Sequence, residues 1–421
     1  MRSNQRLFPE VSLPTSAGVA EVQRFTIFFA VVYFAQGLAD LSAGLANQPL
    51  QYLLKDTLGL SATDSGFFWA VIGLGWTCKP LYGLLSDCLP FAGYHRKSYL
   101  IMMSTLGTGC WLFLSFFPPS YLLILIVLTL CAATLAFSDV MTDAVMVEVG
   151  RPLQLTGNFQ AIQWASMSFA LVLAQLGGGY LATYAAPRTV FLTTALFPLL
   201  TLAATLALIR EPTTQASRQR VYDTFHALRY SAQSRILWLV VVFLFLWNFS
   251  PSLGTPLLYY QRDILHFSKV FIGTLGALSN AAGIVGAIVF FLYCRQISLT
   301  HLLTLAVLLG VISALGYLGL VGPKSAIVLA LFFGFIWQIT HLTVLDLAAR
   351  TCPVGAEGTV FALLMSTLNL GKTGGTALGG WLYDHTGLQM LILVSAVFTA
   401  LCGIVVPFLA AASQADPQRP S

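Results

Sequence analysis

Long apolar runs separated by short polar gaps make up most of the chain. A run of about 20 apolar residues is long enough to cross the hydrocarbon core of a bilayer as a helix. The spacing of the gaps predicts twelve such spans, near residues 25–47, 65–86, 98–117, 120–147, 156–183, 189–209, 236–259, 270–293, 301–320, 325–348, 358–382 and 388–411. We therefore expect an all-α polytopic membrane protein.

Composition agrees with a chain that lies mostly in lipid. Of the 421 residues, 57% are hydrophobic and 9% are charged, whereas soluble globular chains are about 45–50% apolar and about 25% charged. Mean hydropathy is +0.80. Residues 1–24 are polar and lack the apolar stretch of a cleaved signal peptide. We expect a prokaryotic inner (plasma) membrane protein that inserts through its own first span.

Lys and Arg residues in the gaps predict the orientation. Fourteen of the 21 fall on the side of both termini and five on the other, and the side richer in these residues is usually cytoplasmic. We expect both termini in the cytoplasm, so the net charge of +5 reflects topology and not a nucleic-acid partner. The seven cysteines are scattered with no CxxC pair, so we expect neither a metal site nor a cofactor.

The chain divides into two similar halves. The expected parts are a cytoplasmic tail at 1–24, a six-helix bundle at 25–209, a cytoplasmic central loop at 210–235, a second six-helix bundle at 236–411 and a cytoplasmic tail at 412–421. Shifting the second half back by 201 residues aligns Pro152 with Pro353, Gly157 with Gly358, Ala161 with Ala362, and Gly178–Leu181 with Gly379–Leu382. Parallel repeats of six spans are typical of the major facilitator fold, which we therefore expect.

Polar residues concentrate in spans that would line the central cavity of that fold. The first span carries Gln36, Asp40 and Asn47, and the tenth carries Gln338, His341 and Asp346. The seventh span reads NFSPSLGTP over Asn248–Pro256. Its two prolines remove backbone hydrogen bonds, so we expect a broken helix there. Unpaired carbonyls inside a membrane are tolerated only beside protein or water, which predicts a solute path at this break.

The stretch FSDVMTDAVMVEVGR in the fourth span places Asp139 and Asp143 on one helix face. A charged Asp at a helix centre costs roughly 2.5–3.5 kcal/mol to insert. Two carboxylates one turn apart can hold one proton between them and titrate as a unit. We expect them to couple transport to protons. The alternative is that one or both only neutralise Lys79, and an ion pair that breaks during transport would do both.

Two lysines, Lys79 and Lys372, lie inside predicted spans. Either could bind a substrate carboxylate or extend to the membrane interface. Asn369 lies in a polar strip around Lys372, and the fifth span carries a matching strip with Gln160 and Trp164. His341 and Asp346 are further candidates for proton coupling. The alternatives are a packing role for His341 and a helix-end ion pair of Asp346 with Arg350, four residues on.

The loop GLLSDCLPFAGYHRKSYL resembles the loop signature of major facilitator carriers, in which a glycine and an aspartate precede basic residues. Gly83, Asp87, Arg96 and Lys97 occupy those positions. The resemblance implies a gating loop that holds adjacent helices together on the cytoplasmic side. The gap before the basic pair is longer here than usual, so the geometry of the loop is open.

Three separated stretches resemble the folate-biopterin transporter family: KPLYGLLSDCLPFAGYHRKSYL, DVMTDAVMVEVGR and LAARTCPVGAEGTVFALLMSTLN. GTPLLYYQRDILHFS is similar to that family as well. The resemblance covers both halves. It implies twelve spans, transport of folates or pteridines, and importance for the motifs that contain Lys79, Asp139 and Asp143.

We therefore expect a secondary active transporter of folate or a related pteridine, coupled to protons and working by alternating access as a monomer. Candidate substrate-binding residues are Asp40, Lys79, Asp139, Gln160, Trp164, Asn248, Tyr259, Asn369, Lys372 and Arg350. Cationic groups would meet the folate carboxylates, carboxylates would accept from pterin N–H groups, and aromatic rings would stack. Alternatives are a carrier of another organic anion or amphiphile, and a non-transporting pigment-delivery or assembly factor. No motif of a hydrolase or nucleotide-binding enzyme is present, so we do not expect an enzyme.

Overall fold

A computed structural model describes residues 16–211, 234–294, 297–352 and 357–409, and these are almost entirely helical. The first half contains α1 (Ser16–Ala39), α2 (Asn47–Tyr52), the π-helical turn η1 (Leu53–Thr57), α3 (Ala62–Thr77), α4 (Lys79–Cys88), α5 (Lys97–Phe116), α6 (Tyr121–Leu153), α7 (Thr156–Tyr184) and α8 (Pro187–Leu208). The second half contains α10 (Arg235–Phe249), α11 (Gly254–Asp263), α12 (Lys269–Leu292), α13 (Leu299–Gly316), η3 (Tyr317–Gly319), α14 (Pro323–Thr351) and α15 (Glu357–Cys402). Residues 1–15 of the predicted N-terminal tail, most of the predicted central loop and the predicted C-terminal tail lie outside the described residues, whereas residues 16–24 belong to α1.

Twelve membrane crossings follow from these helices. Ten stretches of the described chain are long and apolar enough to cross a bilayer. The second crossing is shared by α3 and α4, which are separated by a break at Cys78. The α15 stretch would be roughly 69 Å long if straight, more than twice the hydrocarbon core of about 30 Å. It turns at Gly387, whose φ of 78° is non-helical, so it makes two crossings.

The first predicted span is wrong at its end. Instead of continuing to residue 47, α1 stops at Ala39. The Asp40 carboxylate accepts hydrogen bonds from the Ser42 backbone N–H at 3.2 Å and from its hydroxyl at 2.8 Å, which starts a turn. Short polar side chains that bond to nearby backbone compete with the helix in this way. Asn47 therefore belongs to α2 and does not share a helix face with Gln36.

The seventh predicted span is broken, as the two prolines indicate. α10 ends at Phe249 and α11 begins at Gly254. The segment between them packs on α15, where the Ser252 N–H donates to the Gly375 carbonyl at 2.8 Å. A Cβ on Gly375 would lie 2.6 Å from the backbone oxygens of both Asn248 and Ser250. Glycine at this position allows the broken backbone to be satisfied by a neighbouring helix.

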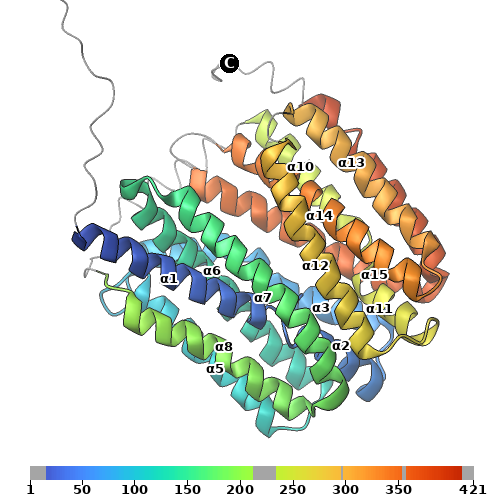
Figure 1. Cartoon of the computed structure of the whole chain (residues 1–421), viewed down its shortest axis with the longest axis horizontal. Coiled ribbons are helices and arrows are strands. Elements are labelled where there is room, and N and C mark those ends of the chain that lie inside the picture. Colours follow the sequence, from blue (N-terminus) through green and yellow to red (C-terminus); the bar gives the residue numbers. More distant parts are fainter. Residues whose placement is uncertain (1–15, 212–233, 295–296, 353–356, 410–421) are drawn as a thin grey trace, which may run out of the picture.

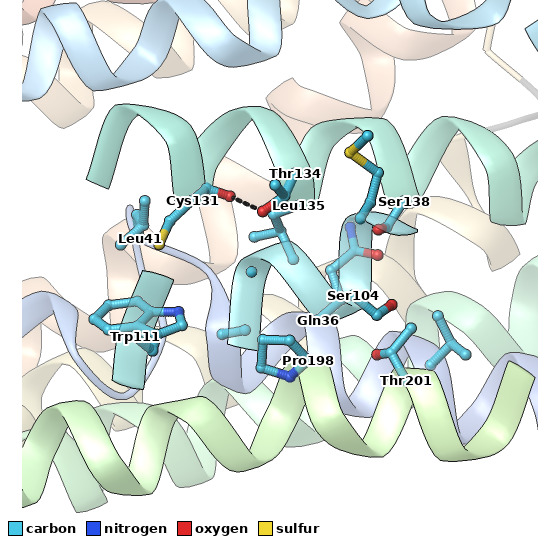
Figure 2. Close-up of a pocket in the computed structure, with 14 residues that line it drawn as sticks. Gln36, Leu41, Ser104, Trp111, Cys131, Thr134, Leu135, Ser138, Pro198 and Thr201 are labelled. Atoms are coloured by element: carbon cyan, nitrogen blue, oxygen red, sulfur yellow. Dashed lines mark hydrogen bonds between the residues drawn. The ribbon is translucent and has the colours of Figure 1, made fainter. Parts of the chain in front are cut away.

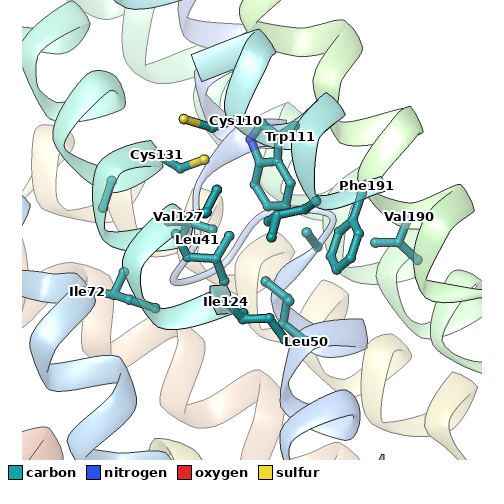
Figure 3. Close-up of a cluster of buried hydrophobic side chains, with 14 of the residues drawn as sticks. Leu41, Leu50, Ile72, Cys110, Trp111, Ile124, Val127, Cys131, Val190 and Phe191 are labelled. Atoms are coloured by element: carbon teal, nitrogen blue, oxygen red, sulfur yellow. The ribbon is translucent and has the colours of Figure 1, made fainter. Parts of the chain in front are cut away.

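Two helical halves lie side by side, with α1–α8 in blue to green and α10–α15 in yellow to red (Figure 1). Each has its own buried apolar clusters. One cluster of the first half surrounds Trp111 and Phe191 (Figure 3), and one of the second half surrounds Phe243 and Val344. Across the boundary α3 packs along α15, and α7 packs along α12.

The halves meet tightly at one end of the molecule, where η1 and the start of α3 face α11 and the start of α12. We call this the closed end. Tyr52 and Ala62 of the first half share a buried cluster with Leu258 and Tyr259 of the second, and α2 and α11 lie near each other in Figure 1. A Cβ on Gly380 would lie 2.3 Å from the Ala62 carbonyl oxygen. Glycine therefore brings the two backbones into contact.

Candidate functional site

A buried ion pair connects α4 and α6 inside the first half. Lys79 Nζ lies 2.5 Å from Asp139 Oδ2, and the Asp139 side chain is only 7% exposed. The other carboxylate oxygen accepts a hydrogen bond from Gln36 Nε2 of α1 at 2.6 Å. Each oxygen of Asp139 thus has its own donor, which offsets much of the cost of burying the charge.

Asp143 lies one turn along α6 and also faces α1. Its Oδ1 accepts a hydrogen bond from the Tyr33 hydroxyl at 2.5 Å. Both aspartates therefore contact the same neighbouring helix, as their spacing of four residues predicts. Asp139 has a cationic partner, whereas the donor to Asp143 is neutral. Asp143 is accordingly the member of the pair that can take up a proton without breaking an ion pair.

The break between α3 and α4 positions the lysine. Cys78 has φ −82° and ψ 4°, outside helical geometry, and Pro80 lies in the first turn of α4. Proline lacks an N–H and so fits a helix start. Lys79 Nζ also lies 4.6 Å from the centroid of the Trp76 ring. A cation over an indole ring is electrostatically attracted to it, so Trp76 gives the ammonium a second partner.

A small, mostly apolar cavity lies beside Gln36, between α1, α5, α6 and α8 (Figure 2). Its volume is about 30 Å³, enough for one water molecule. Four of its lining residues carry hydroxyl groups: Ser104, Thr134, Ser138 and Thr201. Ser104 Oγ is buried and has no hydrogen-bond partner among the described residues.

Polar candidates of the second half lie along the contact of α15 with α3. Asn369 Nδ2 donates to the Trp76 carbonyl at 3.1 Å, and a Cβ on Gly73 would lie 2.9 Å from Thr373 Oγ1. The helices are therefore antiparallel, with Lys372 level with Gly73. Lys372 is exposed.

Asn248 and His341 lie near Lys372 and the neighbouring residues of α15. A Cβ on Gly371 would lie 3.2 Å from Asn248 Cβ, so Asn248 packs one residue from Lys372. His341 stacks on Trp337 with ring centroids 4.8 Å apart and an angle of 6°, and Lys372 is close enough to act on it electrostatically.

Other candidates lie elsewhere. Asp346 pairs with Arg350 at 2.9 Å along α14, which is the helix-end pair that their spacing allows. Asp40 takes part in the turn after α1 and does not reach Asp139. Gln160 and Trp164 are exposed on α7. Tyr259 lies at the closed end, where its hydroxyl donates to the Leu60 carbonyl at 2.8 Å, so its ring is not free to stack on a substrate in this conformation.

The predicted gating loop forms a compact cluster around Arg96. The guanidinium contacts Asp87 at 2.5 Å and Glu148 of α6 at 2.9 Å. Burial lowers the pKa of Arg96, but these two carboxylates raise it by more, so the net shift is upward. Ala92 and Gly93 both have positive φ, at 49° and 83°, and this tight turn takes up the extra loop length.

The rest of the gating loop ties the start of α5 to the end of α8. Lys97 Nζ donates to the Ile209 carbonyl at 2.8 Å, and the Glu211 carboxylate accepts from the backbone N–H of Lys97 at 2.7 Å. Gly83 faces α6, where an added Cβ would meet Val140 at 3.7 Å. Glu148 is a member of this cluster that the loop signature did not indicate.

Sequence analysis also missed two reciprocal ion pairs at the closed end. Lys55 of η1 lies 2.8 Å from Asp263 of α11, and Lys269 of α12 lies 3.0 Å from Asp56 of η1. Each ammonium also lies over a tyrosine ring of the opposite half, Lys55 over Tyr259 and Lys269 over Tyr52. The sequence LLKDT shows Lys55 next to Asp56. The partners of these two residues lie more than 200 positions away, so only the fold brings them together.

Within the described residues no group of three His, Cys, Asp or Glu side chains gathers to hold a metal ion. The charged groups instead pair with one another and with amides, hydroxyls and rings. Such an arrangement can bind a charged solute and exchange a proton.

Comparison with known proteins places the chain in a family. Residues 36–418 match the BT1 family. A folate-biopterin transporter of Synechocystis is 30% identical over 92% of this chain and 81% of its own length. A probable folate-biopterin transporter of Arabidopsis thaliana is 28% identical over 90% of this chain and 91% of its own.

Solved structures agree on the fold. The D-xylose-proton symporter has a TM-score of 0.72 at 13% identity, covering 92% of this chain and 97% of its own. The nucleoside transporter NupG has a TM-score of 0.70 at 12% identity, covering 93% of this chain and 100% of its own. The predicted fold and the predicted family are thereby confirmed. The chain belongs to the BT1 family and is a polytopic membrane transporter with the major facilitator fold, not an enzyme.

Proposed function

We propose that the chain is a secondary active carrier of folate or a related pteridine, coupled to protons, in a prokaryotic inner membrane with both termini cytoplasmic. The relatives named as folate-biopterin transporters support the substrate class. The observation that carries the coupling is the paired arrangement of the aspartates, Asp139 on Lys79 and Asp143 on Tyr33. With that orientation the closed end is extracellular, and the conformation faces inward.

The geometry supports a division of roles. Lys372 is exposed beside the boundary of the halves and can meet a carboxylate of the substrate. Asp143 takes up and releases the proton. The Lys79–Asp139 pair transmits this change in charge to α1, because Asp139 also accepts a hydrogen bond from Gln36. Because Tyr33 and Gln36 lie on α1, protonation of one carboxylate changes how α1 is held against α6.

Uptake of radiolabelled folate by a folate-requiring host that expresses the chain tests the proposal. We expect accumulation that increases when the outside is acidified and is lost with a protonophore. If the host without the chain takes up as much folate as the host that expresses it, the chain is not a folate carrier. A carrier of another organic anion would instead fail with folate and succeed with that anion.

A non-transporting pigment-delivery or assembly factor needs no proton site in the membrane. The double variant Asp139→Asn with Asp143→Asn separates this alternative. Loss of uptake with the protein still present in the membrane supports the carrier, and full biological function of the double variant supports the assembly factor.

A further inference from the structure

One buried amide of the first half has no partner for its donor group. Gln163 of α7 is only 1% exposed, and its Nε2 atom is buried without a hydrogen-bond partner among the described residues. Most buried polar groups in folded proteins are paired, because a buried donor without an acceptor is costly. An acceptor that reaches this amide in another state of the protein would account for it.

The packing of α7 on α1 sets the level of this amide in the molecule. Phe159 of α7 contacts Phe29 of α1, with ring centroids 5.1 Å apart. About two turns on, Gly37 packs so closely against a later turn of α7 that an added Cβ would lie 2.8 Å from the nearest side chain. The two helices therefore run parallel. Between these contacts, Tyr33 follows Phe29 by four residues, and Gln163 follows Phe159 by four residues, so the two lie at one level.

The hairpin of α6 and α7 gives the same level independently. A Cβ on Gly150, near the end of α6, would lie 2.9 Å from Thr156 Cα at the start of α7. Seven residues back along α6 is Asp143, and seven residues on along α7 is Gln163. Both contacts thus place Gln163 level with the hydrogen bond that the Tyr33 hydroxyl donates to Asp143 at 2.5 Å.

The charged and titratable groups that face Asp143 come from three helices: Tyr33 of α1, Lys79 of α4 and Asp139 of α6 itself. Lys79 and Asp139 pair with each other. Nearer the start of α5 and the end of α6, the charged residues belong to the gating-loop cluster: Arg96, Lys97 and Glu148. No residue of α7 is charged. What α7 adds at the level of Asp143 is therefore a neutral donor, the Gln163 amide.

We propose, resting on the proposed function, that Gln163 positions Tyr33 after Asp143 has taken up its proton. An ionised Asp143 holds the Tyr33 hydroxyl, because hydrogen bonds to a charged acceptor are roughly twice as strong as those between neutral groups. A protonated Asp143 holds it less strongly, and the hydroxyl oxygen then turns to accept from Gln163 Nε2. Proton uptake thereby transfers a bond of α1 from α6 to α7. Gln163 is a positioning residue and carries no proton itself.

Uptake of folate at different outside pH values, in the host that expresses the full chain, tests this role. Gln163→Met keeps the length of the side chain and removes its donor. Gln175→Met is the matched control, because Gln175 is a glutamine of the same helix whose Nε2 already donates to the Ala43 carbonyl at 2.8 Å. Tyr33→Phe, alone and combined with Gln163→Met, shows whether Gln163 acts through the tyrosine. Thermal unfolding of each purified variant is measured alongside.

We expect half-maximal uptake by Gln163→Met to need a pH lower by about half a unit to one unit, because loss of one hydrogen bond weakens the protonated state roughly three- to tenfold. Its unfolding temperature should equal or exceed that of the parent, since the donor that it removes is unpaired in this conformation. Gln175→Met should keep the pH midpoint of the parent and unfold at a lower temperature. In the Tyr33→Phe background, Gln163→Met should cause no further shift.

A pH midpoint of Gln163→Met equal to that of the parent would overturn the positioning role and leave the proposed function intact. A shift that persists in the Tyr33→Phe background would also overturn it, because Gln163 would then act without the tyrosine. A lower unfolding temperature of Gln163→Met would mean that the amide is already paired and structural. A parent whose uptake does not depend on outside pH would remove the proposed proton coupling and this role together.

Discussion

At the scale of single residues, the account depends on the different partners of two neighbouring aspartates. The spacing of Asp139 and Asp143 predicted one shared face and left their roles open. In the structure Asp139 forms an ion pair with Lys79, and Asp143 accepts a hydrogen bond from Tyr33. Tyr33 and Gln36 could not be assigned from the sequence, because their contacts with α6 join positions more than 100 residues apart.

Replacement of Asp143 by Asn should uncouple transport from protons. The amide keeps the shape and can still bond to Tyr33, but it cannot take up a proton at physiological pH. We expect accumulation up a pH gradient to fall at least tenfold, while exchange of substrate at equal pH stays within threefold of the parent. Glu21→Gln, at an exposed pair on α1, is the control. Accumulation by the Asp143 variant that equals the parent would show that the proton is carried elsewhere.

Replacement of Lys372 by Ala should weaken binding of folate more than binding of biopterin. A hydrogen bond to a charged group contributes about 1.5–3 kcal/mol, so the difference should be roughly tenfold or more. Calorimetry or competition for uptake with both ligands measures it. Arg188→Ala, at the start of α8, is the control. Equal losses for the two ligands would assign Lys372 a structural role.

At the scale of elements, the first, second and seventh crossings are each interrupted by a break. The prolines of NFSPSLGTP predicted the break in the seventh crossing. The breaks after Ala39 and at Cys78 were not predicted, because the apolar runs resume within a few residues of Asp40 and Lys79. In both cases the interruption follows from local backbone geometry, the Asp40 turn in the first and the non-helical Cys78 in the second.

The packing of the α10–α11 break on α15 can be tested with one methyl group. In Gly375→Ala the new Cβ would lie 2.6 Å from two backbone oxygens, which cannot move as a side chain would. Overpacking of this kind costs about 1–3 kcal/mol. We expect a lower thermal unfolding temperature and reduced transport. Gly109→Ala, a helical glycine with open space around it, should keep or slightly raise the unfolding temperature. Equal behaviour of the two variants would mean that the break is not held by α15.

At the scale of the whole molecule, the sequence predicted twelve crossings in two halves but not which conformation the chain adopts. The closed end depends on contacts between residues far apart in the sequence, including Lys55 with Asp263 and Lys269 with Asp56. The same long-range pairing explains why Tyr259, expected to stack on substrate, lies in a contact between the halves.

In alternating access one half rocks against the other, so the closed end must open during transport. Spin labels at Thr57 and Ile264, both exposed and on opposite halves, report the separation there by pulsed electron resonance. We expect two distance populations whose ratio changes with substrate, and a larger long-distance population when Lys55 and Lys269 are both replaced by Met. A single distance under all conditions would make the closed end, and the break beside it, a fixed structure.

Counterflow in proteoliposomes tests the central claim, transport of pteridines by this chain, most directly, because it needs no gradient of protons. Vesicles are loaded with unlabelled folate, biopterin or glutarate, and entry of external radiolabelled folate is followed in time. The account predicts a transient accumulation of label with folate or biopterin inside and none with glutarate, and it predicts that Asp143→Asn keeps this accumulation. Entry of label that is the same for all three internal solutes, or absent from all, would contradict it.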